Sequence, residues 1–452
     1  MFENTTLYFA YYPFVILSFI YMLKKVIGNK IGLYIVMIFW AGMFQFLSNL
    51  LQYYGIPFNL FNIYKIIIVI WGIYLSYHNI LNNNNKIDIS VGIAWLLFSV
   101  IFWLSYIFYR GDLITILSQY FYKLGLIYII YNTFKYLRYD VEKAANIKKL
   151  VITILYIQII LSIIKIILSY IIVGHLVEYI VGSVSSGGAG TAVVLPISGL
   201  ILYWHANDKV LKGRKIIISL SFILIGIASA KRSPVFMFPF IYLLLTAQSL
   251  KFNYLIRYIP IAFILFYIGV RSNPSLNPEK KNWGSFNINY ALNYALEYNF
   301  GETDIGYILS PEYENQGRGG NLFLIFEPQR IGLKEGHEYI IGKGIYDVAV
   351  RKYGRFIGGS YDIESKGLMS SLIGNIYRYG YIGAILIIIF VLLIFRNVAD
   401  KKLRMILTIF YLWELIFYSD QFMFSSSSAI VIILVCMISS YKPNNYIIAE
   451  SY

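Results

Sequence analysis

Long apolar runs separated by short polar stretches dominate the pattern of this chain. Each run is close to the roughly 20 residues that an α-helix needs to cross the hydrocarbon core of a bilayer. The runs do not alternate between polar and apolar positions, so the strands of a membrane barrel are not expected. The pattern predicts thirteen membrane-spanning helices, near residues 8–23, 31–52, 60–81, 89–109, 113–134, 150–173, 191–206, 216–230, 234–249, 255–270, 379–395, 404–419 and 421–440.

The positions of Lys and Arg orient these helices, because short loops on the cytoplasmic side of a membrane are enriched in both residues. One set of alternate loops holds 20 cations, from Lys24 to Lys442, and the opposite short loops hold three, namely Arg110, Lys231 and Arg232. The side with 20 cations is therefore predicted to be cytoplasmic, with the N-terminus outside and the C-terminus inside. This bias accounts for much of the net charge of +15, so nucleic acid is not an expected partner.

Composition excludes the main alternatives to a membrane protein. Hydrophobic residues make up 58% of the chain and charged residues 13%, whereas soluble domains are about 25% charged. The mean hydropathy is +0.64. The single cysteine, Cys436, cannot form an internal disulfide. We therefore expect an all-α polytopic integral membrane protein with about thirteen transmembrane helices.

One long segment departs from the pattern of short loops. Residues 271–378 form a predicted extracytoplasmic loop with 12 Lys or Arg and 12 Asp or Glu, and connections of such length are usually functional. Within it, the aromatic-rich stretch 286–300 predicts a helix that either lies on the outer membrane interface or packs inside the loop's own core. The chain thus divides into a transmembrane bundle over 1–270, the loop over 271–378, and three C-terminal spans with a cytoplasmic tail over 379–452.

Several cations lie where a membrane disfavours them. Lys65, Lys123 and Lys165 fall within predicted spans, where a charge near the bilayer centre costs about 2.5–3.5 kcal/mol or more. Snorkelling to the outer headgroups explains Lys65 well and Lys123 poorly. Together with Arg110, Lys231, Arg232 and Arg271, these residues give the outer half an excess of positive charge. Because the planar guanidinium of Arg binds two phosphate oxygens at once, the excess favours a lipid-borne phosphate or pyrophosphate at the outer leaflet.

Short motifs for other chemistries are missing from the sequence. There is no P-loop, no GxGxxG after a strand, no HExxH and no CxxC. The four histidines, His78, His175, His205 and His337, do not have the spacing of metal ligands. We therefore predict neither a metal nor a cofactor.

Three short segments carry a resemblance to a known family. Residues 230–234 (AKRSP) form a hairpin between two spans, residues 185–196 (SSGGAGTAVVLP) are a small-residue entry to a span, and residues 370–383 (SSLIGNIYRYGYIG) close the large loop. In these places, and in its many spans with one late outer loop, the chain resembles the Wzy-type O-antigen and capsule repeat-unit polymerases. The resemblance implies a glycosyltransferase of GT-C-like architecture in the cytoplasmic (inner) membrane of a bacterium.

The resemblance also implies substrates and site residues. Donor and acceptor would be oligosaccharide repeat units linked to undecaprenyl pyrophosphate in the lipid bilayer, with a chain-length regulator as an allowed partner. The leaving pyrophosphate needs its developing charge stabilised, a role predicted for Arg232 and Arg271. Asp362 and Glu364 are predicted as bases toward the acceptor hydroxyl. The predicted substrate-binding residues are Lys231, Arg110, Lys123, Lys165, Arg330, Arg351, Arg355, Gly188, Gly190 and Ser370.

Two alternatives to the polymerase stay open. O-antigen ligases share the architecture but carry a His about eleven residues before the first Gly of the closing segment, where this chain has Met369. A flippase for lipid-linked oligosaccharides would also use intramembrane cations, but it does not need an outer loop of this size. The sequence therefore favours the polymerase.

Overall fold

The computed structural model is built almost entirely of helices. It describes residues 5–56, 58–82, 88–109, 113–138, 140–177, 182–184, 191–205, 215–229, 232–246, 253, 256–300, 322, 325–329, 331, 333–344, 351–352, 355–356, 370–417 and 426–439. The longer helices are α1 (Thr5–Val26), α2 (Lys30–Phe39), α3 (Ala41–Tyr53), α4 (Leu60–Asn82), α5 (Ile89–Tyr109), α8 (Val141–Val173), α9 (Thr191–His205), α10 (Lys215–Ala228), α11 (Arg232–Thr246), α13 (Ile259–Ser272), α14 (Ile288–Phe300), α19 (Ser371–Arg396), α20 (Lys401–Phe417) and α21 (Ser426–Ser439).

Shorter elements connect these helices. α6 (Leu113–Ser118), the π-helix η1 (Gln119–Gly125) and α7 (Leu126–Phe134) follow one another without a break and end in the 3₁₀ turn η2 (Lys135–Arg138). In the loop region lie η4 (Pro274–Leu276), α16 (Gly336–Ile341) and the antiparallel strand pair β1 (Arg351–Lys352) and β2 (Arg355–Phe356).

Within the described part of the chain, five helices are long and apolar enough to cross a membrane: α1, α4, α5, α8 and α19. The count becomes six if α2 and α3, which meet at an angle of 54°, form one broken span. Four further apolar helices, within α9, α10, α11 and α13, are 10–17 residues long. The expectation of a helical chain with several membrane-compatible helices is thus confirmed, while the number thirteen stays a prediction.

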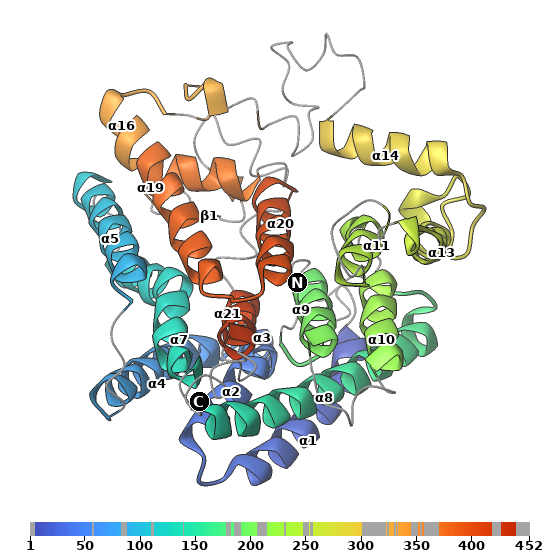
Figure 1. Cartoon of the computed structure of the whole chain (residues 1–452), viewed down its shortest axis with the longest axis horizontal. Helices are drawn as coiled ribbons and strands as arrows, with labels where there is room; N and C mark the ends of the chain where they lie inside the picture. Colours follow the sequence, from blue (N-terminus) through green and yellow to red (C-terminus); the bar gives the residue numbers. More distant parts are fainter. Residues whose placement is uncertain are drawn as a thin grey trace, which may run out of the picture.

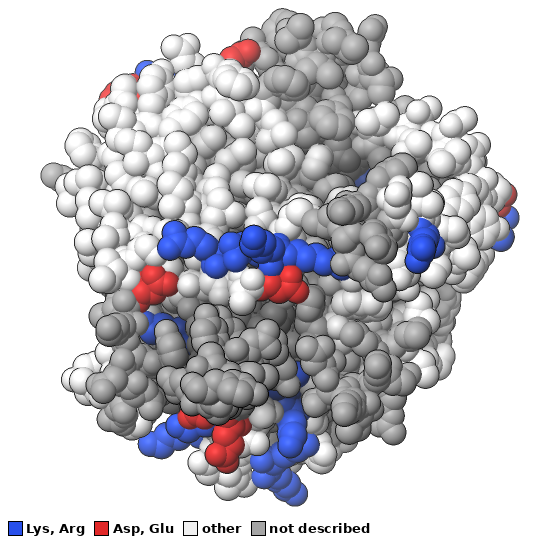
Figure 2. Space-filling view, in the orientation of Figure 1, with Lys and Arg blue, Asp and Glu red and all other residues white. Residues whose placement is uncertain are grey.

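Exposed apolar side chains show where the surface suits lipid. Along α4, Ile63, Ile66, Ile70 and Ile73 are each 39–62% exposed, a contiguous apolar stripe that an aqueous surface would not favour. In Figure 2 the described Lys and Arg side chains gather mainly in a band across the middle of the face and near its lower edge, with Asp and Glu side chains beside both groups.

The helices pack into one large bundle. In Figure 1, α1 and α8 lie side by side along the lower edge of the view, α5 runs along α19, and α13 and α14 lie together at the right. One cluster of buried apolar residues extends from α1 to α21. A smaller cluster joins α11, α13 and α14, and another joins the start of α19 to loop residues near α16.

Polar contacts join helix ends that were predicted to lie on the cytoplasmic side. Asp88, just before α5, accepts hydrogen bonds from Tyr131 Oη at 2.9 Å and from Asn397 Nδ2 at 3.1 Å. Partial burial raises the pKa of Asp88, but these hydrogen bonds and that from Ser90 outweigh it and hold the pKa below its usual value. The ends of α5, α7 and α19 are therefore tied together at one level.

Helix α14 covers the loop ends of α11 and α13. The predicted helix over 286–300 is confirmed for Ile288–Phe300. Its Ala291 is buried and packs with Val235 and Val270, whereas Ile288, Leu292 and Leu296 are 41–45% exposed. One face thus packs on the bundle, and the exposed apolar stripe at four-residue spacing suits the membrane interface.

Candidate functional site

The structure describes the side chains of four predicted site residues: Arg232, Arg271, Lys165 and Ser370. For three others it describes the backbone alone, with Lys123 in η1, Arg351 in β1 and Arg355 in β2. The remaining predictions lie outside the described residues, namely Arg110, Gly188, Gly190, Lys231, Arg330, Asp362 and Glu364. The site is therefore built from the first four and from the side chains that surround them.

Arg232 begins α11 and links it to the large loop. Its guanidinium carbon lies 4.8 Å from the centre of the Tyr294 ring in α14, a cation–π contact that positions the guanidinium group. The next residue, Ser233, accepts a hydrogen bond of 3.0 Å from Trp413 Nε1 in α20. The start of α11 is thus fixed between α14 and α20.

Arg271 lies at the end of α13, where the large loop begins. Its Nε donates to the carbonyl of Gly284 at 2.9 Å, Nη1 donates to Tyr267 Oη at 3.0 Å, and Nη2 approaches the carbonyl of Trp283 at 3.5 Å. None of these partners is an acid, so the hydrogen bonds order the first turn of the loop and leave the positive charge in place.

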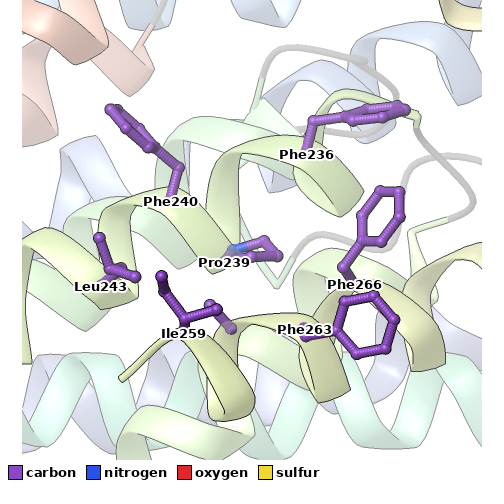
Figure 3. A pocket seen from close by; sticks show the side chains of 8 residues that line it. Phe236, Pro239, Phe240, Leu243, Ile259, Phe263 and Phe266 are labelled. Carbon is purple, nitrogen blue, oxygen red and sulfur yellow. The ribbon is translucent and has the colours of Figure 1, made fainter. Parts of the chain in front are cut away.

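An apolar groove of about 310 Å³ runs between α11 and α13 (Figure 3). Phe236, Pro239, Phe240 and Leu243 line it from α11, and Ile259, Ala262, Phe263 and Phe266 line it from α13. All eight of these described lining residues are apolar. Phe240, Ile259 and Phe263 are 47–49% exposed, so the groove opens onto the surface and suits an apolar chain.

Both arginines lie at the same end of this groove. α11 and α13 run antiparallel, because Phe236 near the start of α11 packs on Phe266 near the end of α13 at 5.6 Å between ring centres. Arg232 precedes Phe236 by one helical turn, and Arg271 follows Phe266 by five residues. We call this end, marked by Arg232 and Arg271, the groove mouth.

The closing segment of the large loop folds as a sharply bent helix. Ser370 caps the start of α19, where its Oγ accepts from the Ile373 amide at 3.4 Å. At Gly380 the backbone leaves the helical region, with φ 66°. The amides of Lys343 and Gly344, just after α16, donate to the carbonyls of Tyr377 and Arg378 at 2.8 and 2.9 Å. These bonds satisfy carbonyls at the end of the first half of α19.

Lys165 lies inside the bundle and contacts aromatic rings. It is 1% exposed, and its Nζ lies 5.1 Å from the ring centre of Tyr8 and 5.3 Å from that of Tyr11, both in α1. Lys65, by contrast, is partly exposed near the start of α4, and its Nζ lies 3.4 Å from Asn62 Oδ1. The snorkelling interpretation therefore suits Lys65, whereas Lys165 is enclosed beside Tyr11, whose Oη donates to the carbonyl of Gly182 at 2.9 Å.

Ser183, the residue after Gly182, lies at the break between α2 and α3. Two turns before Lys165 on α8, the amide of Gln158 donates from Nε2 to Ser183 Oγ at 2.8 Å and accepts the Ser183 amide at 2.7 Å. Ser183 Oγ in turn donates to the carbonyl of Phe39 at 2.6 Å, and its own carbonyl accepts the Gly42 amide at 3.0 Å. Ser183 thus satisfies the backbone on both sides of the break.

Sequence reasoning missed Gln158, Ser183 and Tyr294. Gln158 carries a usable signal, because an amide within an apolar span needs a partner. Tyr294 carries none, since the chain has 43 tyrosines and most have other roles. The structure places Arg232 and Arg271 at the same end of the α11–α13 groove, each with its own partners, and Lys165 on a different helix, α8, against α1.

Comparison with protein-family models, with curated proteins and with solved structures finds no match to this chain. Among the described residues, no three or more His, Cys, Asp or Glu side chains gather in a way that would hold a metal ion. The functional argument therefore rests on the groove, its mouth and the bent segments.

Proposed function

We propose that this chain is a membrane glycosyltransferase that polymerises oligosaccharide repeat units carried on undecaprenyl pyrophosphate at the outer face of a bacterial cytoplasmic membrane. The observation that carries the proposal is the groove mouth: Arg232 and Arg271 lie at one end of an apolar groove that opens on the surface. A polyprenyl pyrophosphate has the matching shape, with an apolar chain and a doubly charged head.

The chemistry of the groove mouth suits this leaving group. The acceptor hydroxyl oxygen forms a bond to the anomeric carbon of the donor glycan, and the bond from that carbon to the pyrophosphate breaks. The electron pair stays on the pyrophosphate, whose growing charge needs fixed positive groups. Arg232, held on Tyr294, is the first such group, and Arg271 adds charge nearby. The hydroxyl proton passes to a carboxylate, for which Asp362 and Glu364 remain the candidates.

The direct test of this function uses purified full-length chain in lipid nanodiscs. The substrate is lipid-linked oligosaccharide extracted from a strain that lacks the gene for this chain. We expect products with two or more repeat units on one lipid and release of one undecaprenyl pyrophosphate for each new linkage, measured by mass spectrometry. Hydrolysis without any longer glycan, or an unchanged substrate, would contradict the proposal.

A lipid-linked oligosaccharide flippase is the second candidate, and one observation favours it. Transporters often build their substrate sites from broken helices near buried ionisable groups. Here the break of 54° between α2 and α3 is bonded by Ser183, and the adjacent Gly182 accepts from Tyr11, which contacts the buried Lys165. A flippase would move lipid-linked oligosaccharide across vesicle membranes without lengthening the glycan, so the same purified chain separates the two functions.

A further inference from the structure

Asn375, in the first half of α19, has a side-chain amide without a hydrogen-bond partner. The residue is 1% exposed, and neither Nδ2 nor Oδ1 has a hydrogen-bond partner in the part of the chain that the structure describes. An amide buried in this way loses its hydrogen bonds to water and gains nothing in return. Nearly all buried polar groups of folded proteins have a hydrogen-bond partner, so this amide calls for one from outside the chain, such as a water molecule, an ion or a ligand.

The surroundings of α19 show which way this amide faces. Ile373, Ile376 and Tyr377 pack with Leu333 in the cluster beneath the large loop. Tyr379 instead packs on the bundle, with its ring centre 5.3 Å from that of Phe98 and 6.0 Å from that of Phe102 in α5.

Asn375 precedes Tyr379 by four residues, so both lie on the same helix face. The amide therefore lies on the side of this half-helix that faces α5.

The bend of α19 keeps this amide in position. A Cβ at Gly380 would lie 2.2 Å from the carbonyl oxygen of Ile340, and one at Gly342 would lie 2.4 Å from the backbone nitrogen of Gly380. The two glycines thus let α16 and α19 touch backbone to backbone. Because the half-helix is locked against α16, Asn375 cannot turn toward water without breaking this contact.

The chemistry of an amide selects the partner. The Asn side chain offers donors on Nδ2 and acceptor sites on Oδ1. A phosphate oxygen only accepts, so it would leave Oδ1 unpaired, whereas a hydroxyl both donates and accepts. We propose that Asn375 binds hydroxyl groups of a sugar in the lipid-linked substrate. This inference rests on the proposed function and assigns to the first half of α19 a sugar subsite separate from the groove mouth.

Stability measurements separate this role from a structural one. Asn277, the control, is a buried amide with three donor contacts from Nδ2, to the carbonyls of Arg271, Asn273 and Lys281 at 2.8–3.4 Å. Asn277→Leu breaks these bonds and should lower the melting temperature. Asn375→Leu removes an unpaired group, so its melting temperature should equal or exceed that of the wild-type chain. A loss as large as that of Asn277→Leu would overturn the inference.

Binding measurements then test the sugar itself. The probes are undecaprenyl pyrophosphate without sugar and lipid-linked oligosaccharide from the deletion strain, each added to full-length chain in nanodiscs. We expect Asn375→Leu to weaken binding of the glycosylated probe about 10-fold or more and to leave binding of the bare lipid unchanged. Asn375→Ala, which removes the amide without adding apolar bulk, should give the same result.

The remaining outcomes are also decisive. Equal binding of the glycosylated probe by the wild-type chain and both variants would overturn the sugar subsite and leave the proposed function standing. Equal weakening of both probes would also overturn it, because it would indicate a role in holding the lipid. Failure of the wild-type chain to bind either probe would overturn the proposed function and this inference with it.

Discussion

Asp88 shows how a single carboxylate joins distant parts of the chain. Its oxygens accept hydrogen bonds from Ser90, Tyr131 and Asn397, which places α5, α7 and the end of α19 at one level. The charged form makes these bonds best, which is why its pKa lies below the usual value although partial burial opposes this.

This depressed pKa gives a pH-dependent prediction. A carboxyl whose pKa is lower in the folded state stabilises the fold above its unfolded pKa of about 4, and the contribution is lost as pH falls through the folded value. Asp88→Asn should therefore cost about 1 kcal/mol at neutral pH, and its melting temperature should converge with that of the wild-type chain in acid. Equal melting temperatures at neutral pH would contradict the assignment.

The residue scale also shows the limits of sequence reasoning. Lys165 and Arg232 were predictable as site candidates from the sequence. Lys165 falls inside a predicted apolar span, and Arg232 falls in a predicted outer loop, where Lys and Arg are rare. Asn375 lies within a segment that the resemblance marks, yet its buried and unpartnered amide depends on how α19 packs. That information lies in contacts between residues far apart in the chain.

At the scale of elements, the bend of α19 is the feature that most constrains the position of Asn375. Gly380 has φ 66°, a value that favours glycine, and the carbonyl of Ile340 fills the place of a side chain. The bend separates an eight- to nine-residue half-helix that carries Asn375 from the apolar part that enters the bundle.

Replacing Gly380 should therefore loosen α16 and α19 together. We expect Gly380→Ala to destabilise the chain by about 2 kcal/mol or more, because it adds a steric clash to an unfavourable φ. Gly336→Ala is the matched control, since a Cβ at Gly336 meets no atom within 4 Å. Thermal unfolding monitored by intrinsic fluorescence gives the melting temperature of each variant. Equal melting temperatures for the two variants would contradict a tight backbone contact between α16 and α19 at Gly380.

Hydrophobic patterning predicts the helices better than their ends and breaks. The expected span 60–81 matches Leu60–Asn82 closely, because an uninterrupted apolar run sets both its length and its place. α8 begins at Val141, nine residues before the expected 150, because Asp140 caps it by accepting the Lys143 amide at 2.9 Å. The break at Trp40 has no local signal, since Ser183 from a distant segment supplies its hydrogen bonds.

At the scale of the whole molecule, contacts join helix ends that the sequence predicts on the same side of a membrane. On the predicted cytoplasmic side, Lys402 Nζ donates to the carbonyl of Leu245 at 2.9 Å. At the opposite ends, Phe108 of α5 stacks on His337 of α16. The α11–α13 groove opens on the surface, and Arg232 at one end of it contacts Tyr294 of α14.

The central claim is that the groove mouth serves glycan polymerisation, and the length distribution of surface glycan tests it most directly. A strain that lacks this chain is supplied with the wild-type chain, Arg232→Ala, or Arg257→Ala, whose exposed arginine precedes α13 at the opposite end of the groove. We predict a full ladder for the wild-type and Arg257→Ala chains and single repeat units for Arg232→Ala at equal membrane levels. A full ladder with Arg232→Ala would contradict the account.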